Sequence, residues 1–241
     1  MLKPEILGQI KSILGEDKVN ISEGKVFLYP QDTSSIAEIV KLANQKNFKI
    51  IPLGKETKIK YQSQEDEVVI KTDRLNKIKK VVPEDLYIIL EPGVSLKELN
   101  QEISSYSLFY PLSTENSLGT TGGSVATSLQ GENNLKEIKT KEYVLALEIV
   151  SPTGEILKVG ARTFKSVTGY DLPRLYVGSW GSLGMITEIT LRLMPVGKKD
   201  EFENIVLKTS KKINPSSDDP KDKVNLRIKE ILDPQGIFPH L

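Results

Sequence analysis

The 241-residue chain contains no cysteine, and its only histidine, His240, stands next to the C-terminus. Without cysteine, this chain forms no disulfide bond, uses no thiolate nucleophile and ligates no iron–sulfur cluster. We therefore also expect no zinc or other metal site. The charges nearly cancel, with 33 basic against 32 acidic residues. The basic excess that is typical of nucleic-acid-binding proteins is missing.

Long apolar runs are missing as well. No segment approaches the roughly 18–20 apolar residues that a membrane span requires. The opening Met1-Leu-Lys-Pro-Glu5 lacks the apolar stretch of a signal peptide. Apolar residues at 38% and charged residues at 27% are typical of a folded globular protein. We expect a cytoplasmic protein with a small-molecule substrate, no nucleic-acid partner and no membrane span.

The first hundred residues alternate between helical and strand patterns. Pro4 and the apolar spacing after it predict a helix that ends near Gly15, and residues 25–29 predict a strand. A helix opening at Thr33 and a strand at residues 49–52 follow with short connections. Strand, helix and strand in this order predict a parallel crossover. Two more strands are expected at residues 68–70 and 87–90, and a helix at 95–104.

From about residue 105 the composition changes, because residues 113–131 are rich in glycine, serine and threonine. Pro152-Thr-Gly154 predicts a hairpin turn between two strands. Strands are expected at residues 143–151, 156–159, 185–193 and 204–208, followed by a polar linker at 209–223 and a helix at 224–232. The pattern predicts two α+β lobes with a boundary near residue 105.

Two loops have the composition of anion-binding sites. Gly54-Lys-Glu-Thr-Lys58 directly follows a buried strand, and successive backbone N–H groups there can form a nest for a phosphate. Gly122 and Gly123 precede a short helix, whose first N–H groups suit a phosphate or pyrophosphate. For each loop taken alone, an ordinary polar connection or a glycine-rich turn remains the alternative.

Three familiar catalytic or nucleotide-binding motifs are excluded. The segment Gly122-Gly-Ser-Val-Ala126 loosely resembles a nucleophile elbow, but a serine hydrolase needs a histidine base and His240 is the only candidate. Gly178, Gly181 and Gly184 lie three residues apart, which is not the spacing of the Rossmann dinucleotide fingerprint. A Walker loop is also absent from the sequence.

Five segments together carry a family resemblance. The most specific is Lys165-Ser-Val-Thr-Gly-Tyr-Asp171, which alone predicts only a polar turn, with Gly178-Ser-Trp-Gly-Ser-Leu-Gly-Met-Ile-Thr-Glu188 after it. The others are the loop at residues 53–58, Pro92-Gly-Val94, Thr120-Thr-Gly-Gly-Ser-Val-Ala-Thr127 and the tail Asp233-Pro-Gln-Gly-Ile237. Taken in their order along the chain, these segments resemble the FAD-binding domain of the vanillyl-alcohol oxidase (PCMH-type) flavoprotein superfamily. Within it, the chain resembles the FAD-binding subunits of bacterial glycolate oxidases, especially the short accessory one.

The resemblance implies an α+β, two-lobed PCMH-type fold, with a small α/β lobe and a larger lobe built on a mostly antiparallel sheet. Residues 1–195 would form the FAD-binding domain, with the lobe boundary near residue 105. Residues 196–241 would be a remnant of the substrate domain, a linker and a C-terminal helix. The substrate-binding cap of the relatives would therefore be largely missing.

The resemblance also implies that FAD lies between the lobes, with its diphosphate held by backbone N–H groups. The corresponding cofactor-binding residues are Leu53, Gly54, Lys55, Glu56, Thr57, Lys58, Thr120, Gly122, Gly123, Ser124, Gly131 and Ile186. Covalent attachment in this superfamily uses histidine or cysteine, and neither is near these loops, so FAD should be bound non-covalently. No catalytic residue is assigned.

Two departures from the family pattern bear on function. Glu56 stands where relatives have a glycine, which brings a carboxylate toward the diphosphate, and residues 132–140 lack an aromatic–glycine step. The resemblance implies a FAD-dependent oxidoreductase subunit that oxidises a small 2-hydroxy acid such as glycolate or lactate. Its expected partners are a larger flavoprotein subunit and an iron–sulfur subunit. The alternative is a degenerate, non-catalytic accessory subunit that keeps the fold for assembly of a complex.

Overall fold

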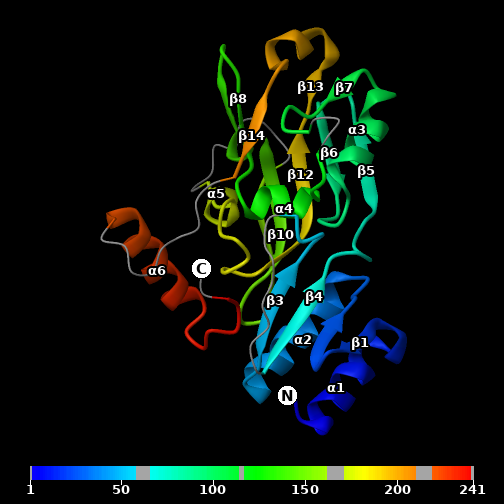
Figure 1. Cartoon of the computed structure of the whole chain (residues 1–241), viewed down its shortest axis with the longest axis vertical. Helices are drawn as coiled ribbons and strands as arrows, with labels where there is room; N and C mark the ends of the chain where they lie inside the picture. Colours follow the sequence, from blue (N-terminus) through cyan, green and yellow to red (C-terminus); the bar gives the residue numbers. More distant parts are fainter. Residues whose placement is uncertain (1, 58–65, 114–116, 162–170, 210–218, 240–241) are drawn as a thin grey trace.

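The computed structural model describes residues 2–57, 66–113, 117–161, 171–209 and 219–239. Figure 1 shows an elongated molecule with the N-terminal lobe at one end and a larger lobe at the other. Each lobe has its own main sheet and its own cluster of buried apolar side chains. The α+β fold class predicted from the sequence is confirmed.

The small lobe is a four-stranded sheet with the strand order β1-β2-β4-β3. The strands are β1 (Val19–Ser22), β2 (Lys25–Leu28), β3 (Lys49–Leu53) and β4 (Glu67–Lys71). Both β2 and β3 run parallel to β4, which lies between them. Helix α2 (Thr33–Lys46) makes the expected crossover, and it begins at Asp32, whose carboxylate accepts a hydrogen bond from the Ser35 N–H at 2.7 Å. Helix α1 (Pro4–Leu14) packs beside α2.

The large lobe is a five-stranded antiparallel sheet with the strand order β11-β10-β12-β6-β5. Its strands are β5 (Ile78–Val82), β6 (Tyr87–Leu90), β10 (Val144–Val150), β11 (Ile156–Gly160) and β12 (Met185–Arg192). Helix α3 (Leu96–Ser104) contributes Leu96, Leu99 and Ile103 to the same core. A capping box formed by Ser95 and Glu98 starts this helix.

The lobe boundary lies earlier in the chain than we expected. Strands β5 and β6 belong to the sheet of the large lobe, so the chain passes from one lobe to the other between residues 72 and 77, not near residue 105. The change of composition after residue 105 falls inside the large lobe. The pairing that assigns β6 to this lobe is with β12, about a hundred residues later, and no local pattern reveals it.

Short elements complete the molecule. They are β7 (Leu108–Phe109), β8 (Gln130–Glu132), β9 (Glu137–Lys139), β13 (Met194–Pro195), β14 (Val206–Lys208), α4 (Thr121–Ala126), α5 (Pro173–Tyr176) and α6 (Pro220–Leu232), with 3₁₀ turns at Glu16–Lys18, Thr140–Glu142 and Val196–Phe202. Strand β7 pairs with β13, and β14 adds to the edge of β8, which also pairs with β9. None of the helices in the ranges given above combines the length and apolarity needed to cross a bilayer.

The segment after Pro195 packs onto both lobes. Strand β14 extends the sheet beside the large lobe, and the tail beyond α6 buries Ile237 and Phe238 in the core of the small lobe. The Ile50 N–H of β3 donates to the Ile237 carbonyl at 2.7 Å. Helix α6 starts four residues before the predicted helix, and most of the predicted linker lies outside the described residues. The division of the chain into domains at Pro195 stays a prediction.

Candidate functional site

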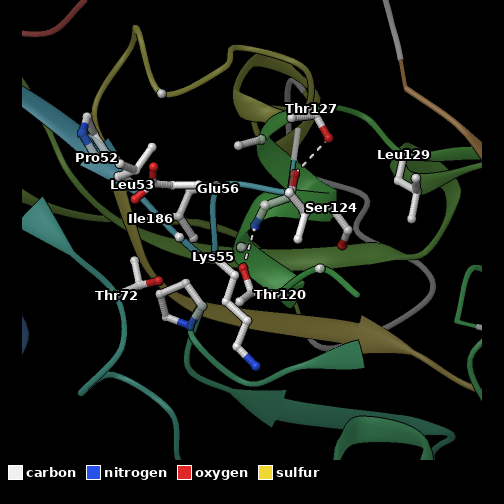
Figure 2. A pocket seen from close by; sticks show the side chains of 18 of the residues that line it. Pro52, Leu53, Lys55, Glu56, Thr72, Thr120, Ser124, Thr127, Leu129 and Ile186 are labelled. Carbon is white, nitrogen blue, oxygen red and sulfur yellow. Dashed lines mark hydrogen bonds between the residues drawn. The ribbon is translucent and has the colours of Figure 1, made fainter. Parts of the chain in front are cut away.

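A pocket of about 340 Å³ lies where the two lobes meet. This volume falls within the range of about 300–1,000 Å³ that is typical of small-ligand sites. Its walls come from the end of β3 with the loop after it, from the start of α4, from the turn before β12 and from Leu207 of β14. Figure 2 shows Leu53 at the end of β3, Thr120 at the start of α4 and Ile186 of β12 around this space.

The structure brings together most of the residues that the family resemblance assigned to the cofactor. The pocket is lined by Leu53, Gly54, Lys55, Glu56, Thr57, Thr120, Gly122, Gly123, Ser124 and Ile186. Lys58 lies outside the described residues, and so does most of the segment Lys165-Ser-Val-Thr-Gly-Tyr-Asp171. The cofactor contacts of these residues stay predictions, but the two loops do face one cavity.

Gly131 does not line the pocket. It lies in β8, where a Cβ on this residue would come within 2.5 Å of Ile205 Cγ2 and 3.1 Å of Leu112 Cδ2. Packing of the chain after Pro195 over β8 therefore accounts for the glycine. Its neighbours Leu129 and Leu207 reach the pocket wall instead.

The loop after β3 offers unused hydrogen-bond donors. Within the described chain, no group accepts a hydrogen bond from the backbone N–H of Lys55, Glu56 or Thr57. Glu56 has φ +56°, in the left-handed region that favours glycine. Successive N–H groups around a left-handed residue are the building unit of anion-binding nests. This loop can therefore bind an anion through its main chain.

The charged side chains of this loop are separated. The Lys71 ammonium donates to Glu56 Oε1 at 2.8 Å, so the carboxylate that the sequence placed near the predicted diphosphate is paired. Figure 2 shows Lys55 extending away from Glu56. Hydrogen bonds from Ser95 lower the pKa of Glu98, and the positive charge of Lys55 adds to this effect. Lys55 therefore lies within electrostatic reach of the start of α3.

The start of α4 uses its N–H groups within the protein. The Thr121 and Gly122 N–H groups donate to the carbonyls of Val94 and Pro92, each at 2.8 Å. The Gly123 N–H donates to the Thr120 hydroxyl at 3.1 Å. The structure therefore shows the N–H groups of Gly122 and Gly123 engaged within the protein, and their binding of a phosphate stays a prediction. Gly122 lets the α4 backbone approach Pro92, because a Cβ there would lie 2.5 Å from Pro92 Cβ.

Most of the remaining wall is apolar and includes residues that we did not predict. They are Pro52, Pro92, Leu96, Leu118, Leu129, Trp180, Met185 and Leu207. Trp180 and Met185 fall within a segment that carried the family resemblance, so that signal was available. Leu207 had none, because its position depends on the pairing of β14 with β8.

One polar side chain in the wall has no partner within the described chain. The hydroxyl of Thr72 is buried there and makes no hydrogen bond. A buried polar group without a partner is costly, so such a group in a pocket indicates a ligand or water. Thr72 follows β4, and because β3 and β4 run parallel their carboxyl ends meet at this edge of the sheet.

Comparison with known proteins gives consistent matches. Residues 24–160, more than half of the chain, match the family described as FAD binding domain. The mitochondrial D-lactate dehydrogenase (cytochrome) of Arabidopsis thaliana is 35% identical over 180 residues, which cover 74% of this chain and 31% of that protein. The glycolate oxidase subunit GlcD of Bacillus subtilis is 30% identical over 202 residues, which cover 83% of this chain and 42% of that protein.

The chain thus spans less than half the length of the curated relatives that it matches. Among solved structures, an alkyldihydroxyacetonephosphate synthase superposes with a TM-score of 0.67 at 21% identity, covering 81% of this chain and 41% of that one. At this identity the likeness shows the fold alone. It agrees with the two-lobed arrangement expected from the sequence.

Proposed function

The chain belongs to the PCMH-type family of FAD-binding domains, and from this premise we propose that the pocket between its lobes holds FAD for the oxidation of a small 2-hydroxy acid. The observation that carries the proposal is the loop after β3. Its residues 55–57 line a largely apolar pocket, and their backbone N–H groups have no acceptor within the described chain.

The residues present fit this cofactor. A dinucleotide of this kind needs main-chain donors for its diphosphate and apolar surface for its rings, and the pocket has both. The Thr72 hydroxyl gives a further hydrogen-bonding group at the wall. When bound, FAD supplies the redox chemistry by accepting a hydride from the substrate carbon that bears the hydroxyl group. The residues of this chain bind and orient the cofactor and exclude water from it. We expect non-covalent binding.

The substrate class rests on the relatives. Two of them are named for D-lactate and glycolate oxidation, and both compounds are small 2-hydroxy acids. This chain matches less than half of those longer proteins, so the complete activity also needs a counterpart of their remaining part. We propose that a larger flavoprotein subunit and an iron–sulfur subunit act with this chain, which has no cysteine to hold a cluster. A cytoplasmic location stays a prediction.

A second candidate function is a non-catalytic accessory subunit that keeps the fold for assembly. One observation favours it. Of the described residues after Pro195, only Leu207 lines the pocket, because β14 and α6 pack onto the two lobes. The described part of this segment therefore offers little surface to a substrate.

We expect the purified protein to bind FAD with a dissociation constant of about 1 μM or tighter, which corresponds to about 8 kcal/mol. The measurement is a titration followed by quenching of flavin fluorescence, with the shift in melting temperature as a second readout. No quenching and no thermal shift would contradict the proposal. Anaerobic addition of D-lactate or glycolate then tests the chemistry. Bound flavin that either acid reduces supports the enzyme, whereas bound flavin that stays oxidised, even with the partner subunits present, supports the accessory role.

A further inference from the structure

The last residue of β4 lies beside the loop that the proposed function assigns to the FAD diphosphate. Strands β3 and β4 are parallel, with Leu53 opposite Lys71. The loop begins at the next residue, Gly54. The Lys71 side chain can therefore reach the loop from the neighbouring strand, and only 12% of its surface is exposed.

One ammonium group makes two contacts within this loop. Lys71 Nζ donates to the Gly54 carbonyl oxygen at 3.0 Å and to Glu56 Oε1 at 2.8 Å. The two contacted residues, Gly54 and Glu56, lie on either side of Lys55 in the sequence. The ammonium therefore connects both ends of this turn. A charged donor makes stronger hydrogen bonds than a neutral one.

Glu56 needs such a tie for two reasons. Its left-handed backbone, at φ +56°, is unfavourable for a residue with a side chain and persists only where the surroundings hold it. Its carboxylate is a negative charge in the wall of a pocket assigned to a doubly anionic group. The Lys71 ammonium, 2.8 Å from Glu56 Oε1, is placed to hold this backbone and to offset this charge.

We propose that Lys71 is a positioning residue for the FAD diphosphate. Its ammonium holds the loop of residues 54–57 so that the N–H groups of Lys55, Glu56 and Thr57 stay free, and it cancels the charge of Glu56. Relatives have a glycine at the position of Glu56. In this chain the pair formed by Glu56 and Lys71 would allow the same left-handed backbone without leaving an unpaired charge. This inference rests on the proposed function.

The test compares the FAD affinity of four variants by quenching of flavin fluorescence. Lys71→Met should raise the dissociation constant at least tenfold, because it removes both contacts and leaves Glu56 unpaired. Lys71→Arg should stay within about threefold of the wild type, since a guanidinium group also donates to two oxygens. Glu56→Gln combined with Lys71→Met should recover part of the loss, because no unpaired charge remains. Lys46→Met is the matched control, since Lys46 pairs with Glu5 on α1 at 3.1 Å and should not affect binding.

Salt separates an electrostatic role from a merely structural one. The loss of FAD affinity in Lys71→Met, relative to the wild type, should become smaller when the ionic strength rises from about 0.1 M to about 1 M. Over this range the Debye length falls from about 10 Å to about 3 Å. If Lys71→Met is too unstable to measure, the double variant tests the proposal by itself. It has lost the tie, so its affinity should remain below that of the wild type.

The outcomes distinguish the two proposals. If the wild type binds no FAD, the proposed function fails and this inference fails with it. If the wild type binds FAD and Lys71→Met binds within twofold of Lys46→Met, the inference alone is wrong. Affinity of the double variant equal to that of the wild type would also overturn it, as would a loss in Lys71→Met that salt does not change.

Discussion

Replacing Asp233 with alanine should lower the free energy of unfolding by about 3–5 kcal/mol, the cost of breaking a buried ion pair from one side. Asp233 and Lys229 are 3% and 4% exposed and form an ion pair at the end of α6. The Lys229 ammonium also donates to the carbonyls of Ser182 at 2.8 Å and Phe238 at 3.1 Å. The Asp233 carboxylate accepts from the N–H groups of Ile237 and Phe238, each at 2.9 Å.

The substitution would leave a buried ammonium without its counter-ion and two buried N–H groups without an acceptor. Burial lowers the pKa of Lys229, and the neighbouring carboxylate only partly offsets this effect. Loss of Asp233 should lower the pKa further and free the tail that covers the small lobe. Because Ser182 belongs to the turn that carries the pocket residues Trp180 and Gly184, FAD binding should weaken as well.

Equilibrium unfolding in urea measures this effect. Glu5→Ala is the matched control, since it breaks the exposed pair with Lys46 and should cost about 1 kcal/mol or less. Replacing Lys229 and Asp233 together by apolar residues should recover part of the loss, because the unpaired charge disappears. The expected loss is about 3–5 kcal/mol. A loss of only about 1 kcal/mol or less for Asp233→Ala would contradict the prediction.

Elements with local signals could be predicted from the sequence. Pro4 marks the start of α1, and Pro152-Thr-Gly154 marks the turn between β10 and β11. Helix α2 begins at Thr33 as predicted, and its capping side chain is Asp32, which was not predicted. Strand β5 was missed because Lys79 and Lys80 interrupt its apolar pattern. Its pairing with β6, at the edge of the sheet, holds it in place.

The site could be predicted only in part, because only some of its residues leave a local signal in the sequence. The motifs identified the family and two loops that line the pocket, because glycines leave a signal in the sequence. The partners of the N–H groups in α4 left no such signal, since Pro92 lies thirty residues before Gly122. The same holds for Lys71 beside Glu56, which follows from the parallel register of β3 and β4. Contacts between distant segments decide which donors remain available to a ligand.

Gly122→Ala should destabilise the protein by about 1–3 kcal/mol, although alanine is the better helix former. A Cβ on Gly122 would lie 2.5 Å from Pro92 Cβ and 2.9 Å from the Pro92 carbonyl oxygen. The Gly122 N–H donates to that same oxygen, so α4 cannot move away without losing the hydrogen bond. Pro92 and Gly122 both line the pocket, and FAD affinity should therefore fall at least tenfold.

Gly8→Ala is the matched control for this substitution. Gly8 lies within α1, and a Cβ there would meet no atom within 4 Å. The same chemical change should therefore stabilise the protein by up to about 1 kcal/mol through helix propensity and leave FAD binding unchanged. Urea unfolding and flavin titration of both variants measure the two effects. If Gly122→Ala lowers the free energy of unfolding and Gly8→Ala raises it, the close approach of α4 to Pro92, and not a general preference for glycine, shapes this wall of the pocket. Equal stabilisation by both substitutions would mean that the wall yields to a methyl group, and the affinity loss expected for Gly122→Ala would then be wrong too.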